Sequence, residues 1–369
     1  MQTAIRKVYL SILTSIMVLI TVVATTYAWV GIFTYSSLEG FNINLKVDDA
    51  NKSYYLKIST DGINFKESVD LIDIQKQIMD NMGIEYESFI DSSDADAVDR
   101  YFNKTTELVP VTTTMNYQTN ELDKFFSMEN IKGNKIFEES NKYFKFDLYL
   151  MVEPREGVSS TTNLNANIFL SDIGNSLKGT KSSGTLTNGN PFSSLPSSEE
   201  FMYPLLKEIP RDFSIDSSYA TRFALSIYNP ILIDDTYTAQ TPNKTIIYQG
   251  GTSVPSKNGD IYSLGGILPE EYNMALKEFN KLQNLNLDIT NVDPNRLNDL
   301  ELVGGNDMLW VRPDVVDDVN YNYFGVSNGK LTKIKITVYF WFEGWDADCL
   351  NFINKKNVTL NLKFSTDLN

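Results

Sequence analysis

The sequence contains no histidine and only one cysteine, Cys349. The lack of histidine removes the commonest general base, the commonest metal ligand and the usual switch near neutral pH. A lone cysteine excludes any disulfide within the chain, and no base can be placed beside it as a partner for nucleophilic catalysis. The 47 acidic residues offer many carboxylate pairs for glycoside hydrolysis, yet no pair stands out. We therefore expect no catalytic residues and a protein that is not an enzyme.

Positive charge is also scarce, with 32 basic against 47 acidic residues and a net charge of -15. Because an acidic surface repels phosphate backbones, we expect no nucleic-acid partner. Hydrophobic residues make up 42% of the 369 residues and charged residues 21%, as in globular proteins. Neither an internal repeat nor a clear linker is visible, which favours one elaborated domain over two moderate ones.

Charged residues are absent from Val8 to Leu38, directly after Arg6 and Lys7. About 20 such residues span a bilayer core of roughly 30 Å. The basic residues before the segment should stay in the cytoplasm, so the rest of the chain faces outward. The pattern therefore predicts a lipid membrane as partner and a cell-surface or extracellular location. The residues expected inside the membrane include Tyr9, Leu13, Met17, Ile20 and Val23.

Two interpretations of this leader remain open. It is either an uncleaved signal anchor that runs to about Phe33, or a signal peptide cut between Ala28 and Trp29. Both divide the chain into residues 1–35, the signal peptide or transmembrane anchor, and residues 36–369, an extracellular body.

The body contains many short segments in which apolar and polar residues alternate, the period of a half-buried strand. Their order is not an alternation of strands and helices, so it predicts a mainly β fold: an antiparallel β-sandwich with two or three helical insertions, whose first and last strands share one sheet. The expected strands are 41–47, 54–60, 109–114 (an edge strand, because of Pro110), 142–152 with 164–170 as its neighbour, 219–228, 244–249, 331–342 and 358–364.

Helices are expected at 69–82, ended by Gly83, and at 269–282. Asp61-Gly62 signals a turn after the second strand, so the body should open with a hairpin or meander. Residues 171–200 are rich in Ser, Gly, Asn and Thr and predict a surface loop.

Three carboxylates stand close together after the strongest strand: Glu343, Asp346 and Asp348. They are candidates for a calcium site, since hard cations prefer oxygen ligands, although their spacing is not that of an EF-hand. A turn at Gly344 with solvated acids is the simpler interpretation. The acidic segment 91–99 more simply marks a loop or helix start. Arg222, a charge within an apolar strand, either points outward, as alternation favours, or pairs with a buried acid.

Three stretches together resemble a known group of proteins. The leader ends in Thr-Tyr-Ala-Trp at residues 26–29, Arg222 lies in Ala-Thr-Arg-Phe-Ala-Leu-Ser at 220–226, and residues 343–349 read Glu-Gly-Trp-Asp-Ala-Asp-Cys. The leader is similar to those of exported Firmicute surface proteins of the camelysin and TasA type, which include biofilm-matrix fibre subunits. The two later stretches resemble other exported proteins of the same bacteria. This resemblance implies a jelly-roll-like sandwich at the cell surface, with self-association as its mode of action.

The leading hypothesis is a non-enzymatic surface or structural protein that assembles with itself or with other surface proteins. A membrane-anchored structural protein of a virus particle has nearly the same sequence features. A third hypothesis is an adhesin or glycan-binding module, in which Trp310, Trp341 and Trp345 would line the site unless they are buried strand residues.

Overall fold

The structure is a computed structural model, and one part of the chain can be described from it. The described residues are 38–47, 54–85, 94–106, 108, 110–116, 119–127, 142–155, 164–170, 175–186, 211–238, 240–249, 297–299, 307–310, 323–343 and 356–367. Within these ranges the chain is mainly β, with strands in three sheets and the two helices α2 (Leu71–Asn81) and α3 (Ala95–Thr105). The mainly β prediction is therefore confirmed. The helix expected at 269–282 lies outside the described residues.

The first sheet, called the β18 sheet, has the order β1-β18-β7-β15, with β8 also paired to β18. Its strands are β1 (Leu38–Val47), β7 (Asn167–Leu170), β8 (Ser176–Gly179), β15 (Asp307–Trp310) and β18 (Lys356–Asp367). Strands β1 and β18 pair in register, for example Ile43 with Leu360 and Leu45 with Leu362. The two ends of the body therefore share a sheet, as predicted. They run parallel, however, whereas the sequence favoured antiparallel pairing.

The second sheet, called the β17 sheet, is built around the 14-residue strand β17 (Lys330–Glu343). Along one side, β17 pairs with β11 and then with β12. Strand β17 also pairs with β5, β3 and β16. Further strands extend the sheet beyond these, and β9 and β10 form a separate ribbon. The strands are β2 (Tyr54–Ser59), β3 (Pro110–Asn116), β4 (Glu121–Ser127), β5 (Phe144–Pro154), β6 (Leu164–Asn165), β9 (Lys181–Leu186), β10 (Arg211–Asp216), β11 (Thr221–Ile227), β12 (Ile231–Leu232), β13 (Lys244–Gln249), β14 (Leu297–Asp299) and β16 (Gly325–Ser327).

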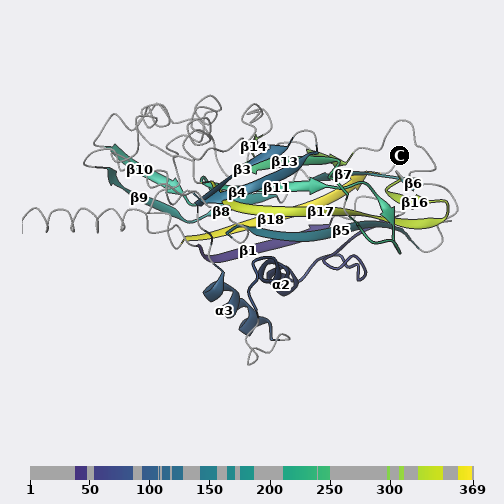
Figure 1. Ribbon diagram of the computed structural model, residues 1–369, viewed down its shortest axis with the longest axis horizontal. Coiled ribbons are helices and arrows are strands. Elements are labelled where there is room, and N and C mark those ends of the chain that lie inside the picture. The colour runs from purple at the N-terminus through teal and green to yellow at the C-terminus, as the bar shows by residue number, and fades with distance from the viewer. Residues whose placement is uncertain are drawn as a thin grey trace, which may run out of the picture.

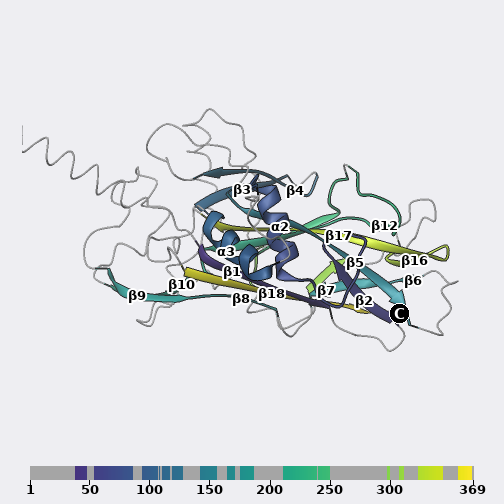
Figure 2. The ribbon, with the colours of Figure 1, turned by 90° about the horizontal axis from the view of Figure 1, so that it is seen from below.

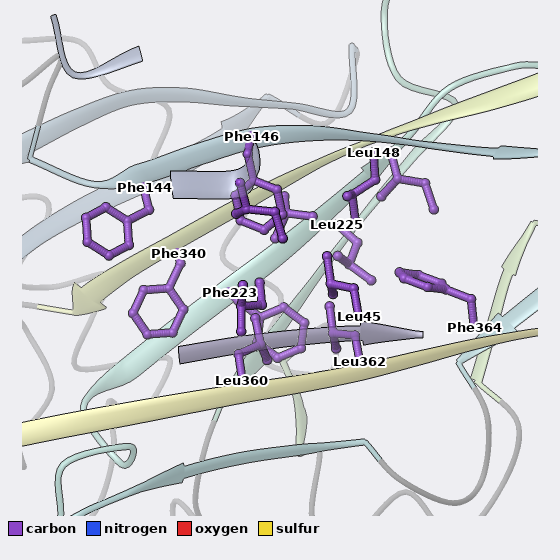
Figure 3. Close-up of a cluster of buried hydrophobic side chains, with 14 of the residues drawn as sticks. Leu45, Phe144, Phe146, Leu148, Phe223, Leu225, Phe340, Leu360, Leu362 and Phe364 are labelled. Atoms are coloured by element: carbon purple, nitrogen blue, oxygen red, sulfur yellow. The ribbon is translucent and has the colours of Figure 1, made fainter. Parts of the chain in front are cut away.

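The larger of the two hydrophobic clusters found among the described residues contains side chains from both large sheets. Figure 3 shows Leu45, Leu360 and Leu362 of the β18 sheet on one side of this core, with Phe223 and Phe146 of the β17 sheet across from them. The ring of Phe223 also stacks on that of Tyr248, with centroids 4.7 Å apart. Because alternate residues of each strand point into this core, the remaining residues form two outer faces.

Helices α2 and α3 lie together on one side of the strands (Figures 1 and 2). Ile78 and Met79 of α2 and Phe102 of α3 are buried in the common core, and Phe102 packs on Phe144 of β5. Gly83, with φ of +68°, follows α2, as the sequence predicted.

Several predicted pairings are wrong. Segment 164–170 does not neighbour β5, because β7 pairs with β18 and β15 while β6 pairs with β16. Strand β3 is no edge strand, since it lies between β17 and β4; Pro110 is tolerated because it is the first residue of the strand. The alternation of a strand shows which of its faces is buried, but not which strands pair with it. This explains both errors.

Two loop predictions also need correction. Segment 171–200 contains strands β8 and β9, and Leu177 of β8 is buried in the core. The expected opening is present only as a short reversal at Asp61-Gly62, where Ile58 and Lys66 form an antiparallel bridge, because β1 and β2 belong to different sheets and form no meander. The Asp61-Gly62 turn does reverse the chain, and the backbones of Ile58 and Lys66 exchange hydrogen bonds of 2.7 and 2.8 Å.

Candidate functional site

The outer face of the β17 sheet collects polar and aromatic side chains from β5, β17 and the loop after β11. Alternation places Asp147 and Tyr149 of β5, with Lys333, Lys335 and Thr337 of β17, on the side opposite the core. We call this surface the tyrosine–lysine face. Its members are Asp147, Tyr149, Tyr228, Tyr237, Lys333, Lys335 and Thr337.

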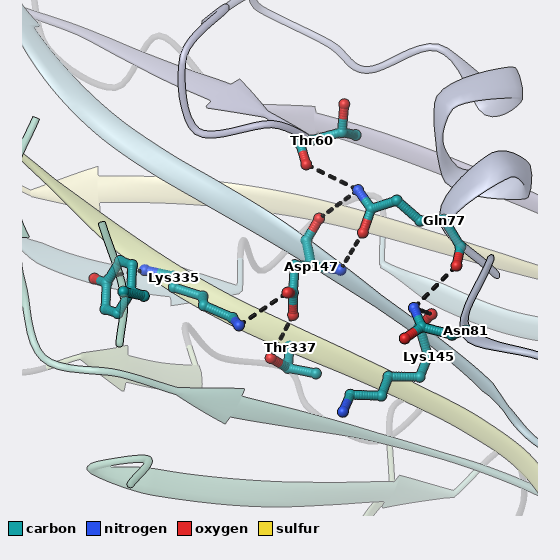
Figure 4. Close-up of polar contacts among 8 residues, drawn as sticks. Thr60, Gln77, Asn81, Lys145, Asp147, Lys335 and Thr337 are labelled. Carbon is teal, nitrogen blue, oxygen red and sulfur yellow. Dashed lines mark hydrogen bonds and ion pairs between the residues drawn. The ribbon is translucent and has the colours of Figure 1, made fainter. Parts of the chain in front are cut away.

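Asp147 is the centre of this face. Its carboxylate lies 2.8 Å from Lys335 Nζ and accepts a hydrogen bond of 2.6 Å from Thr337 Oγ1, as Figure 4 shows. Lys335 also lies over the ring of Tyr228, 5.1 Å from its centroid. Burial alone would lower the pKa of Lys335, but the hydrogen bond and charge of Asp147 outweigh it and raise that pKa. Lys335 therefore stays protonated and acts as a fixed cation, not as a base.

Helix α2 fixes the strand that carries Asp147. The side-chain amide of Gln77 accepts a 2.7 Å hydrogen bond from the backbone N–H of Asp147 and donates one of 3.1 Å to its carbonyl. Gln77 also donates to the carbonyl of Thr60, and Asn81 donates to that of Lys145 (Figure 4). Since β2 pairs only with residues 149–154 of β5, these amides occupy backbone groups that β2 does not reach.

The hydroxyl of Tyr237 fills a gap in the strand pairing beside β17. Its hydrogen is shared between the carbonyls of Asn229, at 2.8 Å, and Lys333, at 3.0 Å, and its oxygen accepts from the backbone N–H of Lys335 at 3.0 Å. Burial raises the pKa of Tyr237 well above its ordinary value of 10.0. This neutral, fully engaged hydroxyl bridges the gap between β11 and β12.

A rigid turn forms one rim of the face. Asp61 accepts hydrogen bonds from the backbone N–H groups of Ile63 and Asn64, at 2.8 and 2.7 Å, and from the hydroxyl of Ser59. Slight burial on its own would raise the pKa of Asp61. The hydrogen bonds outweigh it and hold that pKa well below its ordinary value of 3.8. Ile63 is held in solvent, with 78% of its surface exposed.

The same turn meets the face at Gly62, whose carbonyl accepts a hydrogen bond of 3.1 Å from Lys333 Nζ. Lys333 lies 5.9 Å from the centroid of Tyr149, and burial lowers the pKa of this lysine. Any Cβ at position 62 would come within 3.1 Å of the Tyr149 ring. Lys333 is therefore a buried link between the turn and the sheet.

Beyond Asp147, a second apolar cluster covers the outer face of the β17 sheet. Its buried members are Val111, Phe125, Ala224 and Trp341. Within it, the indole N–H of Trp341 donates a hydrogen bond of 3.1 Å to Glu343, whose side chain is also buried. Glu343, a candidate calcium ligand, therefore has a structural partner.

The other two candidate calcium ligands, Asp346 and Asp348, lie outside the described residues. Among the residues that are described, no group of three or more His, Cys, Asp or Glu side chains could hold a metal ion. In the acidic segment 91–99, Asp94 caps α3 by accepting from the backbone N–H groups of Asp96 and Ala97, so the helix-start interpretation is confirmed.

The expectation that Arg222 points into solvent is wrong. Arg222 is only 3% exposed, and Nη1 donates to the carbonyls of Tyr219 and Thr221, each at 2.9 Å. Alternation does place it on the outer face, opposite Trp341 in register. The apolar cluster around Trp341 covers that end of the face, and this explains why the side chain is buried.

Other predicted residues lie elsewhere. Trp310 and Trp341 are buried strand residues, so neither lines an open glycan site. The expected membrane residues and the Ala28–Trp29 cleavage point lie outside the described residues. None of the helices in the described ranges is long and apolar enough to cross a membrane.

Sequence patterns alone do not identify the tyrosine–lysine face. The alternation of residues 142–152 and 331–342 marks the members on β5 and β17 as outward, but only the register brings Lys335 beside Asp147. The contribution of α2 could not be found, since Gln77 and Asp147 are far apart in the sequence.

Chemically, this arrangement offers flat aromatic rings, fixed cations and hydroxyl groups on a stiff sheet, a composition typical of surfaces that bind by contact. The geometry thus defines a mainly β protein with a polar and aromatic outer sheet face. No protein-family model matches the chain, and no curated protein or solved structure matches it either.

Proposed function

We propose that the protein is a non-enzymatic structural protein of a cell surface, held by residues 1–35 and active through contacts of its outer sheet faces. The uncharged segment from Val8 to Leu38 supports the membrane attachment. The core shared by the two large sheets supports a jelly-roll-like β-sandwich body. Self-association or binding to other surface proteins is the expected mode of action.

The tyrosine–lysine face is the observation that carries this proposal. Lys335 lies 2.8 Å from Asp147, and its raised pKa suits a fixed charge, while Lys333 donates to the carbonyl of Gly62. An amide of α2 and the Tyr237 hydroxyl hold its backbone, and the Asp61 turn contacts it through the hydrogen bond from Lys333 to Gly62. A rigid, flat surface rich in tyrosine suits recognition, because little side-chain entropy is lost on binding.

A membrane-anchored structural protein of a virus particle remains the second proposal, since it would have the same anchor and body. The adhesin proposal is favoured by one feature, the rings of Tyr149 and Tyr237, whose centroids are 6.1 Å apart, beside the cation of Lys333. Aromatic rings next to polar groups can bind sugar rings.

The deciding experiment is intact-mass analysis and negative-stain microscopy of protein from its native source. Filaments or a surface layer would support the structural proposal, and molecules confined to purified virus particles would support the viral one. Glycan-array binding that Tyr149→Ala abolishes and Tyr149→Phe retains would favour the adhesin. Turnover of a glycan or peptide panel, lost on changing one carboxylate, would overturn the non-enzymatic proposal.

A further inference from the structure

The outer face of the β18 sheet carries lysine and uncharged polar side chains. Leu45 of β1, Leu177 of β8 and Leu362 of β18 point into the core, so the residues next to them point outward. We call the resulting surface the lysine–asparagine face. Its members are Asn44, Lys46, Ser176, Lys178, Thr359, Asn361 and Lys363.

Hydrogen bonds tie this face into a flat surface. Asn44 Nδ2 donates to Asn361 Oδ1 at 2.8 Å, and Asn361 Nδ2 donates to Ser176 Oγ at 2.8 Å. The row crosses three strands and joins β1, β18 and β8. Such a row of amide and hydroxyl groups holds the side chains in place and prepares the surface for contact.

The lysines of this face gather positive charge on neighbouring strands. Lys46 and Lys363 are register partners on neighbouring strands and point to the same side. Like charges at such positions repel each other and destabilise a sheet. Lys46 and Lys178 are exposed, and neither forms an ion pair with a described residue.

The helical side of the molecule has the opposite charge. In residues 66–85 and 94–105 the acidic side chains outnumber the basic ones, which are Lys66, Lys76, Arg100 and Lys104. The acidic side chains are Glu67, Asp70, Asp73, Asp80, Glu85, Asp94, Asp96 and Asp99. Asp80 is also unfavourably placed: it is exposed, lies near the C-terminus of α2, and the last turn of that helix has no basic residue. A helix C-terminus carries partial negative charge and disfavours a carboxylate.

We infer that the lysine–asparagine face of one copy docks on the acidic outer surface of α2 and α3 of a second copy. This inference rests on the proposed function and names its partner. The charges of the two surfaces are complementary, so lysines of one copy meet carboxylates of the next. Departures from favourable local electrostatics are expected where a surface has a function. Since the two surfaces differ, the contact is head-to-tail and can repeat along a chain of copies.

The experiment uses the full-length protein in a nonionic detergent and measures sedimentation velocity at about 0.01 M and about 1 M salt, where the screening length falls from roughly 30 Å to 3 Å. The unaltered protein should associate with rising concentration at low salt and dissociate at high salt. A face variant, Lys46→Glu with Lys178→Glu, and a helix variant, Asp80→Lys with Asp96→Lys, should each lose this association. An equal mixture of the two should regain it, because every contact again joins opposite charges.

Matched controls are Lys330→Glu and Asp235→Lys, charge reversals at exposed sites away from both surfaces, which should associate like the unaltered protein. Thermal unfolding shows that the variants are folded, and Lys46→Glu should raise the unfolding midpoint because it places a carboxylate opposite Lys363. Association that both variants retain would overturn the inference and leave self-assembly through another surface. An unaltered protein that stays monomeric at low salt would overturn both the inference and self-assembly as the proposed function.

Discussion

Gln77 binds Asp147 as a neighbouring strand would, with one side-chain amide that occupies both the backbone N–H and the carbonyl of that residue. Replacing Gln77 by alanine removes the hydrogen-bond partner of three partly buried backbone groups, the N–H and carbonyl of Asp147 and the carbonyl of Thr60. We expect Gln77→Ala to lower the free energy of unfolding by about 2 kcal/mol, within the range for unsatisfied polar groups. Urea denaturation measures this loss.

Two further variants identify the cause. Gln77→Glu keeps an acceptor for the Asp147 N–H but loses the donor to its carbonyl, so its loss should be intermediate. Lys76→Ala changes the neighbouring helix position without touching β5 and should have little effect. If Gln77→Ala unfolds at the same urea concentration as Lys76→Ala, the amide does not support the strand.

Asp61 predicts a pH dependence of stability. Its pKa in the folded protein lies below the ordinary value of 3.8, because backbone N–H groups and Ser59 bind the ionised form. The folded state therefore gains stability from Asp61 above about pH 4, and loses it as the pH falls through the lower folded pKa. We expect Asp61→Asn to be less stable than the unaltered protein near neutral pH, by about 1 kcal/mol for the lost charge-assisted bonds.

This difference should shrink as the pH falls from about 3.8 towards the lower pKa of folded Asp61, because the unfolded chain binds a proton at Asp61 before the folded protein does. Urea denaturation of both proteins at several pH values provides the test. The control is Asp235→Asn, at an exposed carboxylate that accepts no hydrogen bond from the described residues. A difference between Asp61→Asn and the unaltered protein that stays constant down to the lowest pH would contradict the prediction.

Strands could be predicted from the sequence where alternation is strong. The expected segment 244–249 coincides with β13, and 331–342 lies within β17. Local pattern decides these elements because each places a complete apolar row against the core. The helix at 69–82 was also predictable, from its apolar spacing and from Gly83 after it.

Pairing could not be predicted in the same way. Strand β1 pairs with β18 across nearly the whole body, and β7 lies in the β18 sheet although β5 precedes it in the chain. The tyrosine–lysine face depends on such pairings, since Lys335 meets Asp147 only through the β5–β17 register. Asn328-Gly329 is a hairpin signal in the sequence, and both residues have the positive φ of the turn between β16 and β17.

Glu343 should matter as an acceptor for Trp341. Glu343→Ala leaves the buried indole N–H without the partner that now lies 3.1 Å away, so we expect a loss of about 1–3 kcal/mol in unfolding free energy. Glu343→Gln keeps an acceptor oxygen and should lose less. The two variants are compared by urea denaturation, and equal stability of Glu343→Ala and the unaltered protein would show that the indole finds another partner.

Backbone conformation and nearby atoms predict how much stability is lost when each of three glycines is replaced by alanine. Gly329, in the β16–β17 turn, and Gly83, after α2, have φ of +75° and +68°, and a Cβ at either would meet nothing within 4 Å. Alanine at each should cost only the left-handed conformation, about 1–2 kcal/mol. Gly62 has φ of +70°, but a Cβ there would lie 3.1 Å from the Tyr149 ring, so Gly62→Ala should cost more.

Urea denaturation of the three alanine variants tests this order, and Gly83→Ala is the matched control because it shares the conformation of Gly329 but not its hairpin. Similar losses for Gly329→Ala and Gly83→Ala would show that φ alone sets the cost. A Gly62→Ala loss no greater than theirs would mean that the Tyr149 ring moves aside easily, which would weaken the view that the turn at Asp61 is held rigidly on the tyrosine–lysine face.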